Sequence, residues 1–286
     1  MHFLYKEKEK EMAFILVIVA VAIFLSVLIL LFRNQAPAYE VPLRRKQAVL
    51  KIGHRGASGY RPENTLSSFK KAIELKVDFI ELDIQLSKDG QIVVFHDPTV
   101  DRTTNGKGEI RDYTYEELFL LDAGSWFHPN FSNEYIPLLS EVLDISLPDT
   151  GLIIELKNPH LSPGIELKLA DELLKRKWDS EKFAGILVQS FDKETIKRFH
   201  ALLPEIPIGI IVRYNPKGIS DSFLNEVSSY AAFVNPKRSM ITPNLIERIH
   251  SKGMKVFTWT VNDKKQVAKL LSYDLDGITT DYPDLF

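Results

Sequence analysis

The stretch VDFIELDIQL, residues 77–86, carries the clearest structural signal in the chain. Aliphatic side chains recur there at every second position, and Glu81 and Asp83 occupy positions between them. Successive side chains of a strand point to opposite faces, so the aliphatic residues share one face and the two acids share the other. An apolar face needs a cover of helices. The pattern therefore predicts a strand whose two acids point into the interior of a closed sheet.

Seven further apolar runs follow the same plan. They are residues 49–54, 151–157, 185–190, 206–212, 231–236, 255–261 and 275–280. Amphipathic segments with helical periodicity lie between most of them, at 65–75, 165–176, 192–202, 220–229, 243–252 and 263–271. Strands that alternate with helices indicate βα units on a parallel sheet. Eight strands in a segment of this length predict an α/β fold, a (β/α)8 TIM barrel.

A doubly wound open sheet is the competing architecture. That fold normally has a glycine-rich phosphate-binding turn after its first strand, and no such turn follows residues 49–54. The alternation breaks at residues 97–137, which show no clear strand. We interpret them as a small insertion after strand 2, on the face formed by the carboxyl ends of the strands. Because few residues follow the eighth run, the last helix is expected to be vestigial or missing.

Composition excludes several classes of function. The 286 residues are 45% hydrophobic and 26% charged, which is typical of a globular protein with a substantial core. The net charge of −2 supplies no basic surface for a polyanion, so no nucleic-acid partner is expected. The absence of cysteine excludes disulfides, thiolate chemistry and cysteine-ligated zinc. No feature indicates an obligate protein partner.

Residues 12–32 are apolar apart from one serine and carry no charge. At about 1.5 Å per residue, a helix of this length crosses a hydrocarbon core of roughly 30 Å. We predict a transmembrane helix between a short tail (1–11) and a tether (33–47), followed by the barrel domain (48–286). The alternative is a signal peptide cleaved near residues 36–38, but the apolar segment exceeds the usual length of about 7–15 residues for that element.

The orientation of this helix is not decided by charge, because basic residues lie on both sides of it. A single N-terminal span before a large domain usually acts as a signal-anchor, and large domains translocate with little regard to charge. We therefore expect a single-pass protein of the cell membrane with an extracytoplasmic domain.

Polar residues at the ends of the first strands predict a site. In GLIIELK, Glu155 and Lys157 alternate with aliphatic residues and point inward, as do Glu81 and Asp83. Three converging carboxylates repel one another unless a cation binds them, and oxygen ligands favour Mg²⁺ or Ca²⁺ over zinc.

Two histidines belong to the same region. A single histidine is more often structural than catalytic, and Glu155 could simply pair with Lys157. However, His54 and His96 lie at or near the carboxyl ends of the first strands, together with the acids. Barrels of this class build their sites on that face, so the joint arrangement favours an active site.

These motifs also resemble a known family. HRGASGYRPENT (54–65), IELDIQLSKDGQIVVFHDPTVDRTTNGKG (80–108), IIELKNP, VQSF, FTWTVN and DGITTDYP are similar to the glycerophosphodiester phosphodiesterase family, over roughly residues 49–284. The resemblance implies a TIM barrel with a small insertion after the second strand. It also implies that His54 and His96 are the general acid/base pair, and that one divalent ion, Ca²⁺ or Mg²⁺, is held by Glu81, Asp83 and Glu155.

The resemblance further implies that Arg55 and Lys157 bind the substrate phosphate, Arg55 as a bidentate fork and Lys157 as a point charge. We interpret Glu63 as a supporting substrate-site residue beside Arg55, although it could equally belong to the start of the following helix. Gln189 and Trp259 lie late in their strands and are expected to line the glycerol or alcohol pocket. Trp259 could instead be barrel core.

Three functions are compatible with these residues. The leading one is metal-dependent hydrolysis of glycerophosphodiesters to sn-glycerol 3-phosphate and an alcohol. In the family's scheme, one histidine deprotonates the glycerol hydroxyl, which attacks phosphorus to form a cyclic phosphate, and the other protonates the departing alcohol. The second is a lysophospholipase D or a relative of the sphingomyelinase D toxins, with lysolipid substrates. The third is a non-catalytic barrel that only binds a ligand. Such a protein is expected to lack one of the family's histidines or metal carboxylates, and this sequence has all of them.

Overall fold

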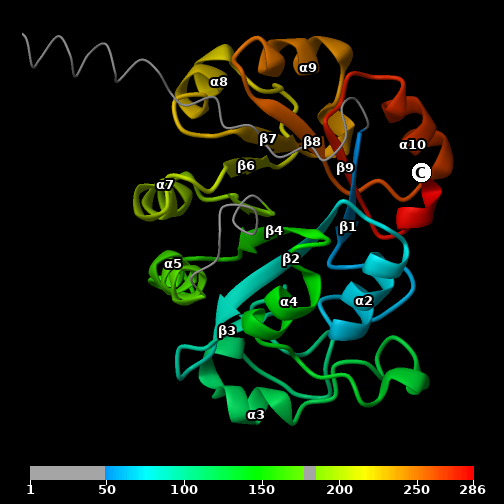
Figure 1. The fold of residues 1–286 in the computed structure, drawn as a ribbon, viewed down its shortest axis with the longest axis vertical. Helices are drawn as coiled ribbons and strands as arrows, with labels where there is room; N and C mark the ends of the chain where they lie inside the picture. The colour runs from blue at the N-terminus through cyan, green and yellow to red at the C-terminus, as the bar shows by residue number, and fades with distance from the viewer. Residues whose placement is uncertain (1–48, 177–184) are drawn as a thin grey trace, which may run out of the picture. The chain divides into compact units, whose positions relative to one another are not determined.

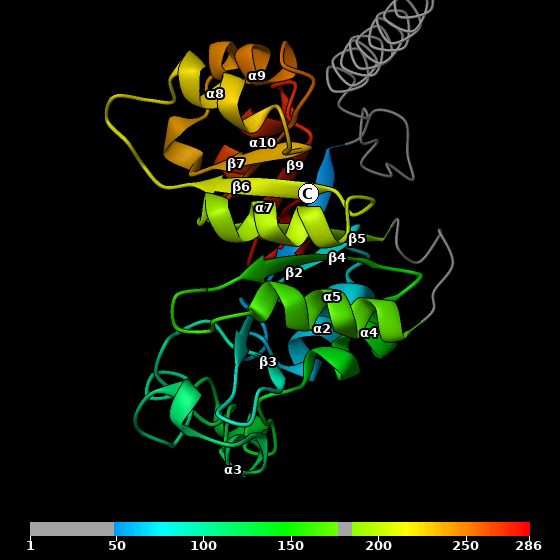
Figure 2. The same ribbon diagram turned by 90° about the vertical axis from the view of Figure 1, so that its left-hand side faces the viewer.

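The computed structural model describes residues 49–176 and 185–286. Eight parallel strands form a closed barrel in this part of the chain (Figures 1 and 2). They are β1 (Leu50–His54), β2 (Phe79–Leu86), β4 (Gly151–Leu156), β5 (Ile186–Ser190), β6 (Ile208–Val212), β7 (Phe233–Pro236), β8 (Lys255–Thr258) and β9 (Gly277–Thr280). β1 pairs with both β2 and β9, which closes the barrel. The predicted barrel is confirmed, and each of the eight apolar runs forms one of its strands.

Helices surround the barrel and follow the strands along the chain. They are α2 (Leu66–Glu74), α4 (Leu139–Ser146), α5 (Ile165–Lys175), α7 (Lys193–Leu202), α8 (Asp221–Val227), α9 (Pro243–His250) and α10 (Lys264–Leu271). Side-chain N-caps such as Thr65 and Asp192 fix where several of them begin. After β9 the described residues form a 3-10 turn, Pro283–Leu285.

The predicted transmembrane segment, 12–32, lies outside the described residues, as do the tail (1–11) and the tether (33–47). None of the helices in the described ranges has the length and apolar character needed to cross a membrane.

The interior of the barrel is divided into an apolar layer and a polar layer. Apolar side chains, most of them large, fill the lower layer: Leu50, Ile52, Phe79, Ile153, Leu187, Ala232, Phe233 and Phe257. Glu81, Asp83 and Glu155 follow further along their strands, above this layer. The aliphatic neighbours of these acids belong to the core between barrel and helices, as predicted. Because the lower barrel is filled, only its mouth, at the carboxyl ends of the strands, is available for a site.

Glycines make the apolar layer possible. Gly209 on β6 lies in register with Phe233 on β7, and a Cβ atom at Gly209 would lie 2.0 Å from the phenyl ring. Gly151 and Gly277 leave room for other phenyl rings in the same way.

Gly209→Ala is therefore expected to lower the free energy of unfolding by about 1–3 kcal/mol, because overpacking forces the Phe233 ring out of its place. Urea unfolding of the full-length chain measures this loss. Adding Phe233→Leu to the variant is expected to recover part of the stability. If Gly209→Ala unfolds at the wild-type urea concentration, the layer is looser than described.

The segment after β2 differs from the prediction. A short strand, β3 (Ile92–Val94), pairs antiparallel with the end of β2, and the barrel helix α4 begins only at Leu139. Between them lies the insertion, which includes α3 (Tyr115–Phe119) and has a small core of its own (Figure 2). The insertion was predicted, but β3 and α4 were not. β3 is too short to show a periodic pattern.

Candidate active site

Three buried carboxylates lie together at the mouth of the barrel. Glu81 and Asp83 come from β2 and Glu155 from β4, and Asp83 is the register partner of Glu155. Each carboxylate offers one oxygen, and the three oxygens lie within 4.8 Å of one another. Carboxylate oxygens are the ligands that Ca²⁺ and Mg²⁺ prefer. The donor set therefore fits one hard divalent cation.

The electrostatics of these groups also favour a cation. Burial, together with Asp83 and Glu155, raises the pKa of Glu81 well above its usual value. Burial likewise raises the pKa of Glu155. Burial acts in the same direction on Asp83, but the charges of Lys157 and Arg55 outweigh it and hold that pKa low. A divalent ion would supply the positive charge that keeps all three carboxylates ionised.

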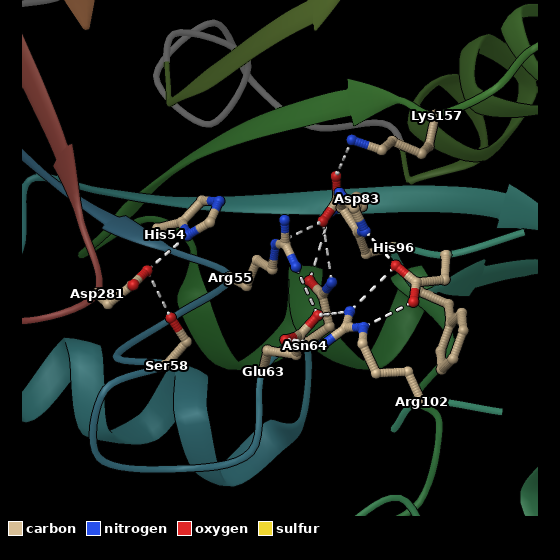
Figure 3. A network of polar contacts seen from close by, with 12 residues as sticks. His54, Arg55, Ser58, Glu63, Asn64, Asp83, His96, Arg102, Lys157 and Asp281 are labelled. Atoms are coloured by element: carbon tan, nitrogen blue, oxygen red, sulfur yellow. Dashed lines mark hydrogen bonds and ion pairs between the residues drawn. The ribbon is translucent and has the colours of Figure 1, made fainter. Parts of the chain in front are cut away.

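Two cationic side chains border the carboxylates. Lys157 Nζ lies 2.8 Å from Glu155 Oε1 and 3.4 Å from Asp83 Oδ1. Arg55 directly follows β1, and its Nε lies 3.3 Å from Asp83 Oδ2 (Figure 3). Its backbone has a φ of 53°, in the left-handed region. Such strained residues cluster at functional sites.

His54, the last residue of β1, is held by Asp281. The His54 Nδ1 atom lies 2.6 Å from Asp281 Oδ1, and Ser58 Oγ donates to the same oxygen at 2.9 Å (Figure 3). Burial and the charge of Arg55 lower the pKa of His54, and the bond with Asp281 opposes this change. A proton on Nδ1 that points at Asp281 leaves Nε2 free to exchange protons with a ligand.

His96, in the loop after β3, has an equivalent partner. Its Nδ1 lies 2.5 Å from Asp97 Oδ1. Arg102 donates two hydrogen bonds to Asp97, of 2.6 and 3.1 Å, and two more to Glu63. Glu63 in turn accepts a hydrogen bond of 2.6 Å from Arg55. A continuous chain of ion pairs and hydrogen bonds thus connects Arg55 with His96 (Figure 3).

A cavity of about 350 Å³ connects these groups. Eight of the ten site residues predicted from the sequence line it: His54, Arg55, Glu81, His96, Glu155, Lys157, Gln189 and Trp259. The other two do not belong to its lining. Asp83 lies beside it in the carboxylate cluster, and the carboxylate of Glu63 is engaged by two arginines.

The residues around Gln189 and Trp259 clarify their positions. Trp259 Nε1 donates to the Asn235 carbonyl at 3.0 Å, and Asn235 Nδ2 donates to Gln189 Oε1 at 3.0 Å. Trp259 thus has its polar atom satisfied and faces the cavity, and is not part of the apolar layer below. Asn64 does not cap α2, because Thr65 does so, and its side chain donates to Asp83 instead.

Comparison with known proteins agrees with this geometry. The glycerophosphoryl diester phosphodiesterase family matches residues 54–285. The chain belongs to this family. A glycerophosphodiester phosphodiesterase of Bacillus subtilis is 37% identical over 249 residues, which cover 83% of this chain and 85% of that protein.

Two other proteins similar to this glycerophosphodiester phosphodiesterase are named for a bound product or for an activity. The structure of an Oleispira antarctica phosphodiesterase in complex with the product sn-glycerol-3-phosphate matches with a TM-score of 0.73 and 34% identity, covering 81% of this chain and 92% of that one. A human protein named lysophospholipase D is 28% identical over 284 residues, covering 84% of this chain and 86% of that protein.

Four charged residues that lie at this site were not identified from the sequence: Asp97, Arg102, Arg213 and Asp281. Asp281 comes two residues after the inward-facing Thr279 of β9, and Arg213 two residues after the inward-facing Ile211 of β6. The alternation of those strands was therefore a usable signal. Asp97 and Arg102 lie in a loop, where no periodicity predicts their partners.

Proposed function

We propose that this cavity hydrolyses glycerophosphodiesters, such as glycerophosphocholine, glycerophosphoethanolamine and glycerophosphoglycerol, to sn-glycerol 3-phosphate and an alcohol. One observation carries the proposal: two histidines, each bound through Nδ1 to an aspartate, line the same cavity as Arg55, Lys157 and two of the three metal-fitting carboxylates, those of Glu81 and Glu155. The relative that was solved with sn-glycerol-3-phosphate supports the same product.

The two histidines act as the acid/base pair. One accepts, at Nε2, the proton of the glycerol hydroxyl next to the phosphoester while that oxygen attacks phosphorus. The other, protonated at Nε2, gives its proton to the departing alcohol, which leaves a cyclic glycerol phosphate. Water then opens the ring, with the histidine roles reversed. His54 and His96 suit these roles because Asp281 and Asp97 hold their imidazoles through Nδ1 and thereby orient them.

Cations neutralise the charge that develops on the phosphoryl oxygens. Glu81, Asp83 and Glu155 would hold one divalent ion, Ca²⁺ or Mg²⁺, which as a Lewis acid polarises a phosphoryl oxygen when bound. Arg55 and Lys157 face the same cavity and bind the remaining phosphoryl oxygens, Arg55 through its planar fork.

Product analysis tests the proposal. The full-length chain is incubated with glycerophosphocholine and Ca²⁺ or Mg²⁺, and the products are separated. The expected products are sn-glycerol 3-phosphate and choline. Release of phosphocholine and glycerol, or no turnover with either ion, would show that the site does different chemistry.

The dependence of kcat/KM on pH assigns the histidine roles. Because the bond with Asp281 raises the pKa of His54, Asp281→Asn is expected to lower that pKa further. One limb of the bell-shaped profile then moves to lower pH while the other stays. The acidic limb reports the pKa of the base, so its movement would identify His54 as the initial base. The alkaline limb reports the pKa of the acid, so its movement would identify His54 as the acid. A profile in which neither limb moves is incompatible with a catalytic His54–Asp281 pair.

A second candidate function is cleavage of lysophospholipids, supported by the similarity to the human lysophospholipase D. The same assay with lysophosphatidylcholine distinguishes the two candidate functions. A much higher kcat/KM for glycerophosphocholine than for lysophosphatidylcholine supports the leading function, and a much higher kcat/KM for lysophosphatidylcholine supports the second.

The membrane location is likewise a proposal. Residues 12–32 support a single-pass anchor in the cell membrane, with the barrel domain on the extracytoplasmic side. Protease treatment of intact cells is expected to remove the domain. Full protection of the domain, with the cells intact, would place it inside.

A further inference from the structure

Arg213 follows β6 and lies in the wall of the catalytic cavity. Its guanidinium carbon lies 4.2 Å from the ring centroid of Phe191. Stacking on an aromatic face limits the motion of a guanidinium but leaves its N–H donors at the edge free. In residues 49–176 and 185–286, the structure shows no ion pair or hydrogen bond of the Arg213 side chain. Its charge is therefore available to a ligand.

The other two cations of the cavity are different. Arg55 pairs with Glu63 and Asp83, and Lys157 pairs with Asp83 and Glu155. Their charges are partly neutralised before any substrate binds. In the proposed function, Arg55, Lys157 and the divalent ion bind the single phosphate of a diester. Arg213 adds a further positive charge that this phosphate does not require.

The location of Arg213 shows which part of a substrate it meets. A groove of about 210 Å³ shares Arg213, Phe191 and Lys157 with the catalytic cavity, but neither His54 nor His96 lines it. The scissile phosphate must lie beside His54 and His96, because these histidines exchange protons with its ester oxygens. The groove therefore receives the part of the substrate that extends beyond the scissile phosphate.

Three more ionisable residues line this groove: Glu155, His160 and Asp192. Glu155 belongs to the carboxylate cluster and is paired with Lys157. The Asp192 carboxylate is occupied as the N-cap of α7, where Oδ1 accepts a hydrogen bond of 2.7 Å from the Thr195 amide. That leaves Arg213 as the charged group in the groove wall best placed to select a ligand.

We propose that Arg213 determines specificity by binding a second anionic group, a phosphate or carboxylate, on the alcohol half of the substrate. The inference rests on the proposed function. It implies that the preferred glycerophosphodiesters carry an additional negative charge beyond the scissile phosphate.

A matched pair of substrates tests this inference in the full-length chain. One is glycerophosphoglycerol, and the other is the same diester with a phosphate on the terminal hydroxyl. The wild type is expected to cleave the phosphorylated diester with a kcat/KM about 3- to 5-fold higher, the range for an ion pair of a solvent-exposed side chain. Arg213→Gln is expected to remove this preference and to leave kcat/KM for the unphosphorylated diester within about twofold.

Control variants distinguish the effect of removing any nearby positive charge from the effect of removing the charge at Arg213. Lys217→Gln removes the same charge a few residues away on an exposed residue that lines neither the cavity nor the groove, and should keep the preference. Arg213→Lys should keep part of it, and added salt should weaken it in the wild type. An equal loss on both substrates in Arg213→Gln, or no wild-type preference, would overturn the inference. If the wild type cleaves neither diester, it is the proposed function that fails.

Discussion

The His54→Ala and His96→Ala variants are each expected to lower kcat on glycerophosphocholine by about 10²- to 10⁴-fold, the usual contribution of a general acid or base. Both imidazoles line the cavity, and each is oriented by its own aspartate. The double variant is expected to lose little more than either single one, because the two groups act in the same step.

The rate of sn-glycerol 3-phosphate release measures this effect. His128→Ala is a suitable control, because His128 is exposed and belongs to the insertion rather than the cavity lining. Wild-type activity in either active-site variant would rule that histidine out as an acid/base catalyst.

Removal of the divalent ion is expected to have the second large effect. Neutralisation of charge on a phosphoryl group by a metal is worth several kcal/mol, so activity should fall by about 10³-fold or more after chelation. Glu155→Gln should have a comparable effect, because it removes one of three ligands. Calorimetry with Ca²⁺ and with Mg²⁺ is expected to show one bound ion in the wild type and none in the variant.

The metal-free protein offers an independent readout of the same site. The pKa of Glu81 is raised by burial and by its neighbours, so its ionised form destabilises the metal-free fold near neutral pH. Glu81→Gln is therefore expected to stabilise the metal-free chain against unfolding while it abolishes metal binding.

Full activity of the wild type after complete removal of the metal would contradict the assignment of the three carboxylates as metal ligands.

The barrel and its carboxylate cluster could be predicted because both follow from the alternation of side chains in strands. In residues 77–86, the same pattern that identifies the strand also sends Glu81 and Asp83 inward, and 151–157 repeats it for Glu155. Closure of the sheet then brings these residues together, since parallel strands end on one face.

The partners of the histidines could not be predicted in the same way. His54 and Asp281 are separated by 227 positions and meet only because β9 pairs with β1. His96, Asp97 and Arg102 lie in a loop whose path depends on the packing of the insertion. Side-chain pairing of this kind depends on tertiary structure and leaves no periodic signal in the sequence.

One experiment tests the central claim most directly. The full-length chain, with Ca²⁺ or Mg²⁺, is given a mixture of glycerophosphocholine and an analogue that lacks the hydroxyl next to the phosphoester, and both are followed by ³¹P NMR. The diester signal is expected to be replaced by that of sn-glycerol 3-phosphate while the analogue remains intact. Cleavage of the analogue at a similar rate, or conversion of the diester to phosphocholine, would contradict the proposed chemistry.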